Sequence, residues 1–433
     1  MKVNVIGGGL AGSECAYQLL RRGFKVDMYE MRGVKNTPCH STASLAELVC
    51  SNSLKAQSLD NASGLLKYEL ARLDSLILRC AYSCDVPAGG ALAVDRVKLS
   101  DSVERALESF DGFRLIRQEV ESVDLTTPTV IATGPLTSDK MAKWISGFLG
   151  GEYLNFYDAV APIVDGDSID YDKAFFAARY GKGGDDYLNC AMNKEQYLNF
   201  HDELIHAERA KLKDFEFQVF ERCMPIEVMA SRGIDTMRYG PLRPVGIRNP
   251  HSAERPYAVV QLRKEDLGGN AYNIVGFQTN LKFGEQKRVF SMIPGLERAE
   301  FLRYGVMHAN TFINAPKVLD SAFAVKDKPS LFFAGQLTGV EGYMESVASG
   351  LIAGINLARR LAGKEDLIMP PTSVIGRLQR HISTPSDDYQ PMNANFGILP
   401  ILEEAPRDKK QRKFKYSLRA VGDVENYLKS IKE

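Results

Sequence analysis

Three spaced glycines close to the start of the chain have the pattern of a pyrophosphate-binding turn. Gly7, Gly9 and Gly12 follow an apolar run at residues 3–6 and precede a helical pattern over residues 11–22. In such a turn the first glycine permits the tight bend, the second permits close approach of the pyrophosphate, and the third permits close helix–strand packing. The phosphates then bind the free amides at the helix amino terminus. This spacing predicts a dinucleotide site but does not identify the dinucleotide.

A carboxylate follows this turn at a fitting distance. A second predicted strand over residues 24–29 ends at Glu30, which could accept hydrogen bonds from the hydroxyls of an adenosine ribose. We expect Gly8, Leu10 and Ala11, which lie within the same turn, to complete this part of the cofactor site.

Seven cysteines are scattered along the chain without a CxxC pair, which predicts free thiols rather than a disulfide framework, a zinc ribbon or another metal site. Most free cysteines are small buried hydrophobic residues. Cys50 differs, because it lies among serine and asparagine in an irregular segment after the second strand. Loops at that place tend to reach over a bound ligand.

Composition sets broader limits on the function. The 433 residues predict two to three domains, and the net charge of zero argues against a uniformly basic nucleic-acid surface, although a local patch remains possible. No apolar run approaches the roughly 20 residues that span a bilayer, and the chain opens with a strand rather than a signal peptide. We therefore expect a cytoplasmic protein without membrane contact.

A second glycine-rich turn occurs late in the chain. Residues 331–336 predict a buried strand ending at Gly335 and Gln336, and a turn containing Gly339 and Tyr343 leads into a helix over residues 345–361. An early phosphate-binding unit combined with a late strand, turn and helix is typical of FAD proteins with one nucleotide domain. The positive end of the late helix would face the isoalloxazine, where negative charge accumulates on reduction.

Other short segments support this interpretation. Gly134 ends a short buried strand, and Ala-Thr-Gly in this order marks the strand that returns to the nucleotide fold of flavin-dependent oxidoreductases. Gly350 and Gly354 would permit close backbone contact of the late helix. Apolar spacing predicts a single core-facing helix over residues 65–80. A second GxGxxG is absent, so a dedicated nicotinamide domain is not expected.

These patterns predict an α/β protein with a discontinuous, Rossmann-like FAD-binding domain and an inserted α+β domain. We place the first part of the FAD domain at residues 1–152, the insertion at 153–328, and the second part at 329–433. The last part carries a basic run at residues 407–416 in which Phe414 and Tyr416 are interleaved. That run is either the solvated face of a helix or a surface that binds phosphates and stacks a base.

Several long motifs resemble those of the folate- and FAD-dependent tRNA (uracil-5-)-methyltransferases, within the flavoprotein superfamily that includes the glucose-inhibited division protein A. They are AELVCSNS at 46–53, VPAGGALAVDR at 86–96, IATGPL at 131–136, CMP at 223–225, VMH at 306–308, AGQLTGVEGY at 334–343 and QPMNANFG at 390–397. The resemblance extends from Val3 to about Tyr416. Two positions depart from the family pattern: Ala191 replaces a proline, and Ala309 replaces an arginine, which puts a phosphate contact by that arginine in doubt.

The resemblance implies transfer of a carbon from 5,10-methylenetetrahydrofolate to C5 of a uridine in the T-loop of tRNA. Reduced FAD would supply the electrons and NADH or NADPH would reload it, with no obligatory protein partner. Carried over by motif, Cys223 would attack C6 of the uracil, and Cys50 would remove the C5 proton. Tyr343 would stack the pterin against the flavin.

Four alternatives remain open at this stage. A related flavoprotein modifies the wobble uridine of tRNA but is longer, with a C-terminal helical domain. The same chemistry could act on a ribosomal RNA uridine. A plain flavin oxidoreductase acting on a small molecule would leave the cysteines structural, and a non-catalytic FAD-binding module would catalyse no reaction.

Overall fold

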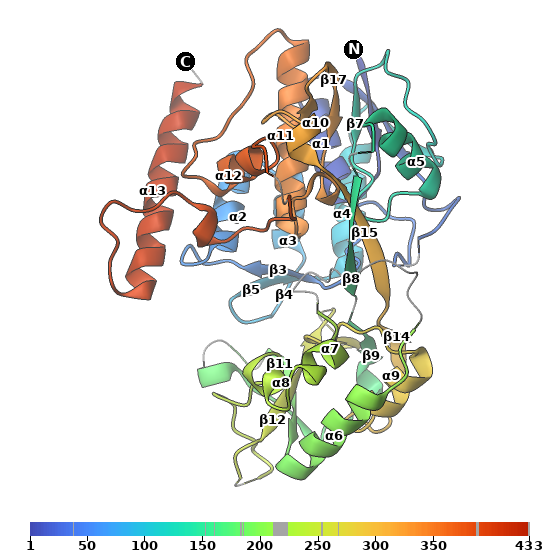
Figure 1. Ribbon diagram of the computed structural model, residues 1–433, viewed down its shortest axis with the longest axis vertical. Helices are drawn as coiled ribbons and strands as arrows, with labels where there is room; N and C mark the ends of the chain where they lie inside the picture. The colour runs from blue at the N-terminus through green and yellow to red at the C-terminus, as the bar shows by residue number, and fades with distance from the viewer. Residues whose placement is uncertain are drawn as a thin grey trace.

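The structure, a computed structural model, describes residues 1–37, 39–151, 153–159, 161–181, 184, 186–210, 224–252, 254–266, 268–386 and 389–431. Figure 1 shows two lobes joined by an antiparallel ribbon of β8 (Tyr153–Ala159) and β15 (Met307–Ile313). The upper lobe carries both ends of the chain.

A six-stranded sheet forms the centre of the upper lobe. Its order is β16 (Ala324–Val325), β17 (Lys328–Phe333), β7 (Thr129–Ile131), β1 (Lys2–Ile6), β2 (Lys25–Glu30) and β6 (Phe113–Arg117). The strands from β17 to β6 are parallel, and β16 is antiparallel to β17. Since β17 pairs with β7, the two ends of the chain share one sheet, which confirms the predicted discontinuous Rossmann-like fold.

The two glycine-rich turns lead into helices that pack against each other, α1 (Leu10–Leu20) and α11 (Tyr343–Leu361). A Cβ atom on Gly350 would lie 2.1 Å from the carbonyl oxygen of Ala11, and one on Gly354 would lie 2.8 Å from that of Cys15. Only glycine permits this separation, so the predicted close contact of the late helix is confirmed.

Further elements surround this centre. They are β3 (Ser53–Ala56), β5 (Ala91–Val94) and β4 (Asp85–Val86), which form a small sheet, and the helices α2 (Ala62–Arg72), α3 (Leu76–Ser83), α4 (Arg96–Glu108), α5 (Asp139–Phe148), α10 (Ala315–Val318), α12 (Val374–His381) and α13 (Lys409–Ser430).

The single helix predicted over residues 65–80 is wrong, because the chain breaks between α2 and α3. Asp74 adopts a left-handed backbone conformation with φ of 57°. Ser75 then caps α3, since its hydroxyl accepts a hydrogen bond from the Leu78 amide at 3.2 Å. The buried carboxylate of Glu14 accepts further bonds from the next two amides, of Leu76 and Ile77.

The lower lobe is built on a second sheet, ordered β10 (Ala174–Phe176), β11 (Tyr187–Met192), β12 (Ala258–Lys264), β13 (Ala271–Ile274), β9 (Ile163–Asp165) and β14 (Phe301–Arg303). Its pairings are antiparallel. Four described helices belong to this lobe: α6 (Lys194–His206), α7 (Ile226–Ser231), α8 (Thr236–Tyr239) and α9 (Phe283–Phe290).

Each lobe has its own hydrophobic core. Side chains from Phe312 to Val325 belong to the upper core, although they precede residue 328. The predicted boundaries of the inserted domain, residues 153 and 328, are not tested by these two cores and stay a prediction. None of the helices in the described part of the chain has the length and hydropathy needed to cross a membrane.

Candidate functional site

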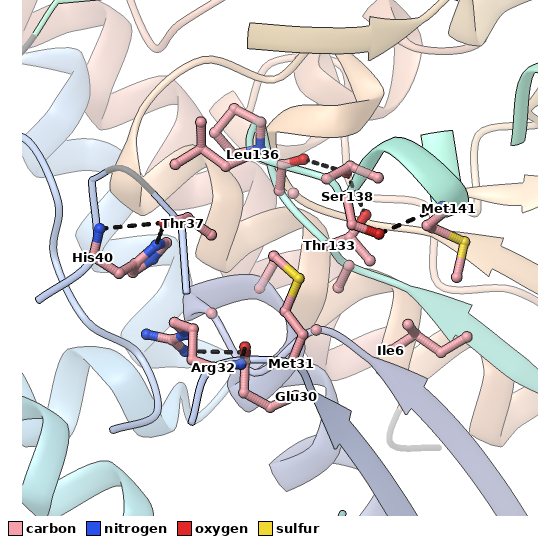
Figure 2. Close-up of a pocket in the computed structure, with 18 of the residues that line it drawn as sticks. Ile6, Glu30, Met31, Arg32, Thr37, His40, Thr133, Leu136, Ser138 and Met141 are labelled. Carbon is pink, nitrogen blue, oxygen red and sulfur yellow. Dashed lines mark hydrogen bonds and ion pairs between the residues drawn. The ribbon is translucent and has the colours of Figure 1, made fainter. Parts of the chain in front are cut away.

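A cavity opens at the carboxyl edge of the parallel sheet, between the ends of β1, β2 and β7 and the starts of α1 and α11 (Figure 2). It brings together residues from both glycine-rich turns. Nine predicted cofactor-binding residues line it: Gly7, Gly9, Leu10, Ala11, Glu30, Gly134, Gly335, Gln336 and Tyr343. Gly8, Gly12 and Gly339 lie outside the lining, so they would support the cavity rather than form its surface.

The first glycine turn has different steric demands at its three positions. Gly7 has φ of +103°, and a Cβ there would lie 2.4 Å from the carbonyl oxygen of Ala132. A Cβ on Gly12 would lie 1.9 Å from the carbonyl oxygen of Gly7, whereas one on Gly9 would meet no described atom within 4 Å. Packing within the protein therefore requires the first and third glycines, and the second leaves open space beside the amino terminus of α1.

That open space fits a pyrophosphate. Gly9 is the N-cap residue of α1, and it has no side chain that could cap the helix. Its free amides and the helix dipole favour an anionic ligand. The same turn therefore provides both the room and the hydrogen-bond donors that a dinucleotide needs.

Glu30 lies beside this turn and is almost fully buried. Its Oε2 accepts hydrogen bonds from the Gly8 amide at 2.8 Å and from Arg32 Nη2 at 3.0 Å, and its Oε1 accepts one from the Arg32 amide at 2.9 Å. Burial alone would raise the pKa of Glu30, but the bonds and charge of Arg32 outweigh burial and lower the pKa. A carboxylate has about four acceptor positions, so one remains for a ribose hydroxyl.

The loop after β2 is held against the cavity by a chain of charged groups. Arg32 contacts Glu30 on one side and Glu47 Oε2 at 3.4 Å on the other, and Glu47 accepts bonds from Ser41 and Thr42. His40 lines the cavity, with its Nδ1 2.6 Å from Thr37 Oγ1. Figure 2 shows this pair on the opposite side of the cavity from Met141.

Cys50 and Tyr343, which are far apart in the sequence, meet at the edge of the cavity. The Tyr343 hydroxyl accepts hydrogen bonds from the backbone amides of Cys50 at 2.7 Å and Ser51 at 3.0 Å. Burial raises the pKa of Tyr343, so the phenol stays protonated. Tyr343 thus lines the cavity with its ring and holds the backbone of Cys50 with its hydroxyl.

Three arginines hold the same loop from the other side. Arg96 donates from Nη1 to the Leu48 carbonyl oxygen at 2.7 Å, and Arg303 donates to that of Cys50 at 3.2 Å. Arg263 donates to Asn52 Oδ1 at 2.7 Å and to Ser51 Oγ at 3.0 Å. Arg263 and Arg303 come from strands of the lower lobe, so the inserted domain helps to position the Cys50 loop.

We call Arg96, Arg263 and Arg303 the arginine clamp. It was not predicted from the sequence. Arg96 closes the VPAGGALAVDR motif and could have been noticed there. Its partner Glu265, whose Oε2 lies 2.5 Å from Arg96 Nε, follows β12, and the two arginines of the lower lobe lie within β12 and β14. None of these three residues belongs to a distinctive motif. Only the fold brings them to the loop.

The remaining cysteines divide clearly. Cys50 is partly exposed, whereas five other thiols are buried: Cys15, Cys39, Cys80, Cys84 and Cys190. Burial raises the pKa of Cys84 and of Cys190 to about 12, which makes both poor nucleophiles. Cys223, the predicted nucleophile, lies outside the described residues.

Comparisons with known proteins identify the family of the chain. Residues 2–365 match the family described as glucose inhibited division protein A. The methylenetetrahydrofolate–tRNA-(uracil-5-)-methyltransferase TrmFO of Natranaerobius thermophilus is 56% identical over 430 residues, 99% of each chain. The protein of the same name from Anoxybacillus flavithermus is 53% identical over 100% of both chains.

A solved structure supports the fold independently. GidA from Aquifex aeolicus superposes with a TM-score of 0.69 at 17% identity, covering 100% of this chain and 75% of that one. At this identity the likeness concerns the fold alone. From the family match and the full-length identity, the chain belongs to the glucose inhibited division protein A family and to the family of TrmFO methyltransferases.

Proposed function

We propose that the protein methylates C5 of a uridine in the T-loop of tRNA, with 5,10-methylenetetrahydrofolate as carbon donor and FAD as cofactor. The observation that carries this proposal is the meeting of the Cys50 loop with Tyr343 at a nucleotide-type cavity. Relatives at 52–56% identity over nearly the full length bear the name of this enzyme.

The residues present fit FAD. Gly9 leaves room for the pyrophosphate, Glu30 retains an acceptor for the ribose, and Gly335 and Gln336 of the late turn line the same cavity. When bound and reduced, FAD supplies the hydride that converts a methylene group to methyl. The positive amino-terminal end of α11 would favour the negative charge of the reduced ring.

Around that ring, each of three protein groups would have a distinct task. Tyr343 would offer its flat ring to the pterin while its hydroxyl holds the Cys50 loop. Cys50 would accept the C5 proton, and Cys223 would attack C6, because C5 of uracil is a poor nucleophile until C6 has been attacked. The arginine clamp would keep the Cys50 backbone in place during proton removal.

Finer features of the proposal are the electron source and the location. NADH or NADPH would bind transiently and reduce the flavin. Tetrahydrofolate would be released as a product. We place the protein in the cytoplasm, because the chemistry needs reduced thiols and access to tRNA. No protein partner is required by this scheme.

Incubation of undermodified tRNA with labelled methylenetetrahydrofolate and NADPH, followed by nucleoside mapping, tests the reaction. We expect label in 5-methyluridine at the T-loop. In a parallel incubation with undermodified ribosomal RNA, label there but not in the tRNA would move the substrate to that alternative, and label absent from 5-methyluridine in both RNAs would overturn the proposal.

A second experiment tests the thiols. tRNA containing 5-fluorouridine, which cannot lose a proton at C5, should be trapped covalently by the wild type and by Cys50→Ala, but not by Cys223→Ala. Cys190→Ala is the matched control, because that thiol is buried in the lower lobe and should not affect trapping. An adduct with Cys223→Ala would show that another group attacks C6.

A further inference from the structure

The helix α13 carries an unusual distribution of charge. Residues 409–422 contain six lysines or arginines and no acidic residue, in a chain whose net charge is zero. They are Lys409, Lys410, Arg412, Lys413, Lys415 and Arg419. The basic half of α13, as we name residues 409–419, is therefore a local concentration of positive charge.

Helix stability does not explain this distribution. Cations near a helix amino terminus are opposed by the helix dipole, which favours acidic residues there and basic residues at the other end. In α13 the acidic side chains lie in the second half, where Asp423 accepts a bond from Thr372 and Glu425 pairs with Arg72. Only the N-cap Asp408 satisfies this preference, so Lys409, Lys410 and Arg412 in the first turn oppose the dipole.

Ion pairing within the protein does not explain it either. Within the described part of the chain, none of the six cations forms an ion pair. Lys415 reaches only a carbonyl oxygen, that of Glu404 at 3.4 Å, while Arg419 donates to two carbonyl groups and lies over the ring of Tyr416. Lys409, Lys410 and Lys415 remain exposed.

The aromatic residues of this stretch have separate roles. Tyr416 stacks on Phe396 with ring centroids 5.8 Å apart and packs against the upper core. Phe414 is 50% exposed, among the lysines. Packing thus accounts for one of the interleaved aromatics and leaves the other on the surface.

Contacts of this half place it on the flank of the candidate site. Phe396 belongs to the segment at residues 390–397, which binds the turn before α11 through the Met392 amide to Gly339 at 2.9 Å. The Ala394 amide also donates to Glu345, two residues after Tyr343. In Figure 1 the amino-terminal end of α13 lies low on the upper lobe, on the side of β3 and the lower lobe.

We propose that the basic half of α13 binds the phosphate backbone of the tRNA substrate, outside the reacting nucleotide. This inference rests on the proposed function. Phosphates neutralise the unpaired cations and release counterions, which supplies binding energy without base recognition. The exposed ring of Phe414 adds a surface on which an unpaired base can stack.

The test removes charge without removing helix propensity. A triple variant, Lys409→Gln/Lys410→Gln/Lys415→Gln, changes only exposed lysines of the basic half. The matched control, Lys25→Gln/Lys328→Gln/Lys364→Gln, removes the same charge from exposed lysines at the amino edge of the sheet and after α11. Binding of unmodified tRNA transcript to each holoenzyme is measured between about 50 and 200 mM salt.

We expect the triple variant to reduce the slope of log K against log salt by about 2–3 and to weaken binding roughly ten-fold or more at low salt. The control should keep the slope, and both variants should keep flavin content and reduction by NADPH. Equal slopes for all three proteins would overturn the inference while leaving the proposed function intact. A change in oligomeric state by sedimentation with an unchanged slope would assign the surface to a second copy, and no tRNA binding by the wild type would overturn both proposals.

Discussion

The variant Tyr343→Phe separates two roles that one side chain combines. It keeps the ring that lines the cavity and removes the oxygen that accepts hydrogen bonds from the Cys50 and Ser51 amides. If the hydroxyl positions the thiol, proton removal should suffer while folate binding is retained.

The magnitude follows from the two lost hydrogen bonds, which leave the amides of Cys50 and Ser51 without their acceptor. Leaving a buried donor without a partner costs about 1–3 kcal/mol, and partial exposure of the Cys50 loop lets water recover part of that cost. A net loss of about 2 kcal/mol corresponds to a roughly 30-fold change in an equilibrium or a rate. We therefore expect kcat to fall about 10- to 100-fold, with KM for methylenetetrahydrofolate nearly unchanged.

Steady-state kinetics and residue-resolved alkylation of Cys50, followed by mass spectrometry, measure the effect. Cys50 should be alkylated faster in Tyr343→Phe, because its loop loses two hydrogen bonds that restrain it. Tyr389→Phe is the control: its hydroxyl donates to the Thr338 carbonyl oxygen at 2.6 Å, within the same turn region but away from Cys50. Wild-type kcat and alkylation in Tyr343→Phe would refute the positioning role.

Three further predictions address the glycine turn, a buried carboxyl and the clamp. Gly9→Ala should fold normally, because Gly9 has φ of −75° and open space around it, but it should lose FAD. Gly12→Ala should instead lower Tm, because its Cβ would clash with the backbone. Normal flavin content in Gly9→Ala would contradict a pyrophosphate site beside Gly9. Burial raises the pKa of Glu69 from about 4.5 to about 7, so its stabilisation is full below pH 4.5 and is lost as pH rises through 7. The stability of wild type relative to Glu69→Gln should fall by roughly 3 kcal/mol over that window, as measured by urea unfolding; a flat difference would exclude this titration. Arg263→Met should cost about 1.5–3 kcal/mol and lower kcat more than FAD affinity, because it leaves an Asn52 oxygen unpaired; unchanged kcat would exclude Arg263 from thiol positioning.

Local patterns predicted the nucleotide half of the site because its demands are local. Gly7 and Gly12 are needed for a turn and a helix contact within a few residues of each other, and both demands leave a mark in the sequence. The late turn could be matched to the early one because it has the same order of buried strand, glycine turn and helix, and Gly350 and Gly354 indicated the close contact of the late helix. The placement of Gly134 and Gly335 at one cavity then follows from parallel strands ending at the same edge.

The sequence predictions were wrong or absent where a residue far away in the sequence determines the local conformation. Apolar spacing alone favours a continuous helix from residue 65 to residue 80. The break at Asp74 is stabilised by Glu14 from α1, which accepts the first free amides of α3, and by Gln18, which donates to the Asp74 carbonyl oxygen. Nothing in the sequence near the break indicates that partner.

The arginine clamp extends the same reasoning to function. Asn52 joins the two lobes, since its amide donates to the carbonyl oxygens of Val94 in the upper lobe and Lys264 in the lower one. Arg263 then binds its side-chain oxygen, and Arg303 binds the backbone of Cys50 itself. Any movement of the lower lobe relative to the upper one must break these bonds or carry the Cys50 loop with it. The lower lobe is therefore tied through Asn52, Arg263 and Arg303 to the loop that carries the predicted base, Cys50.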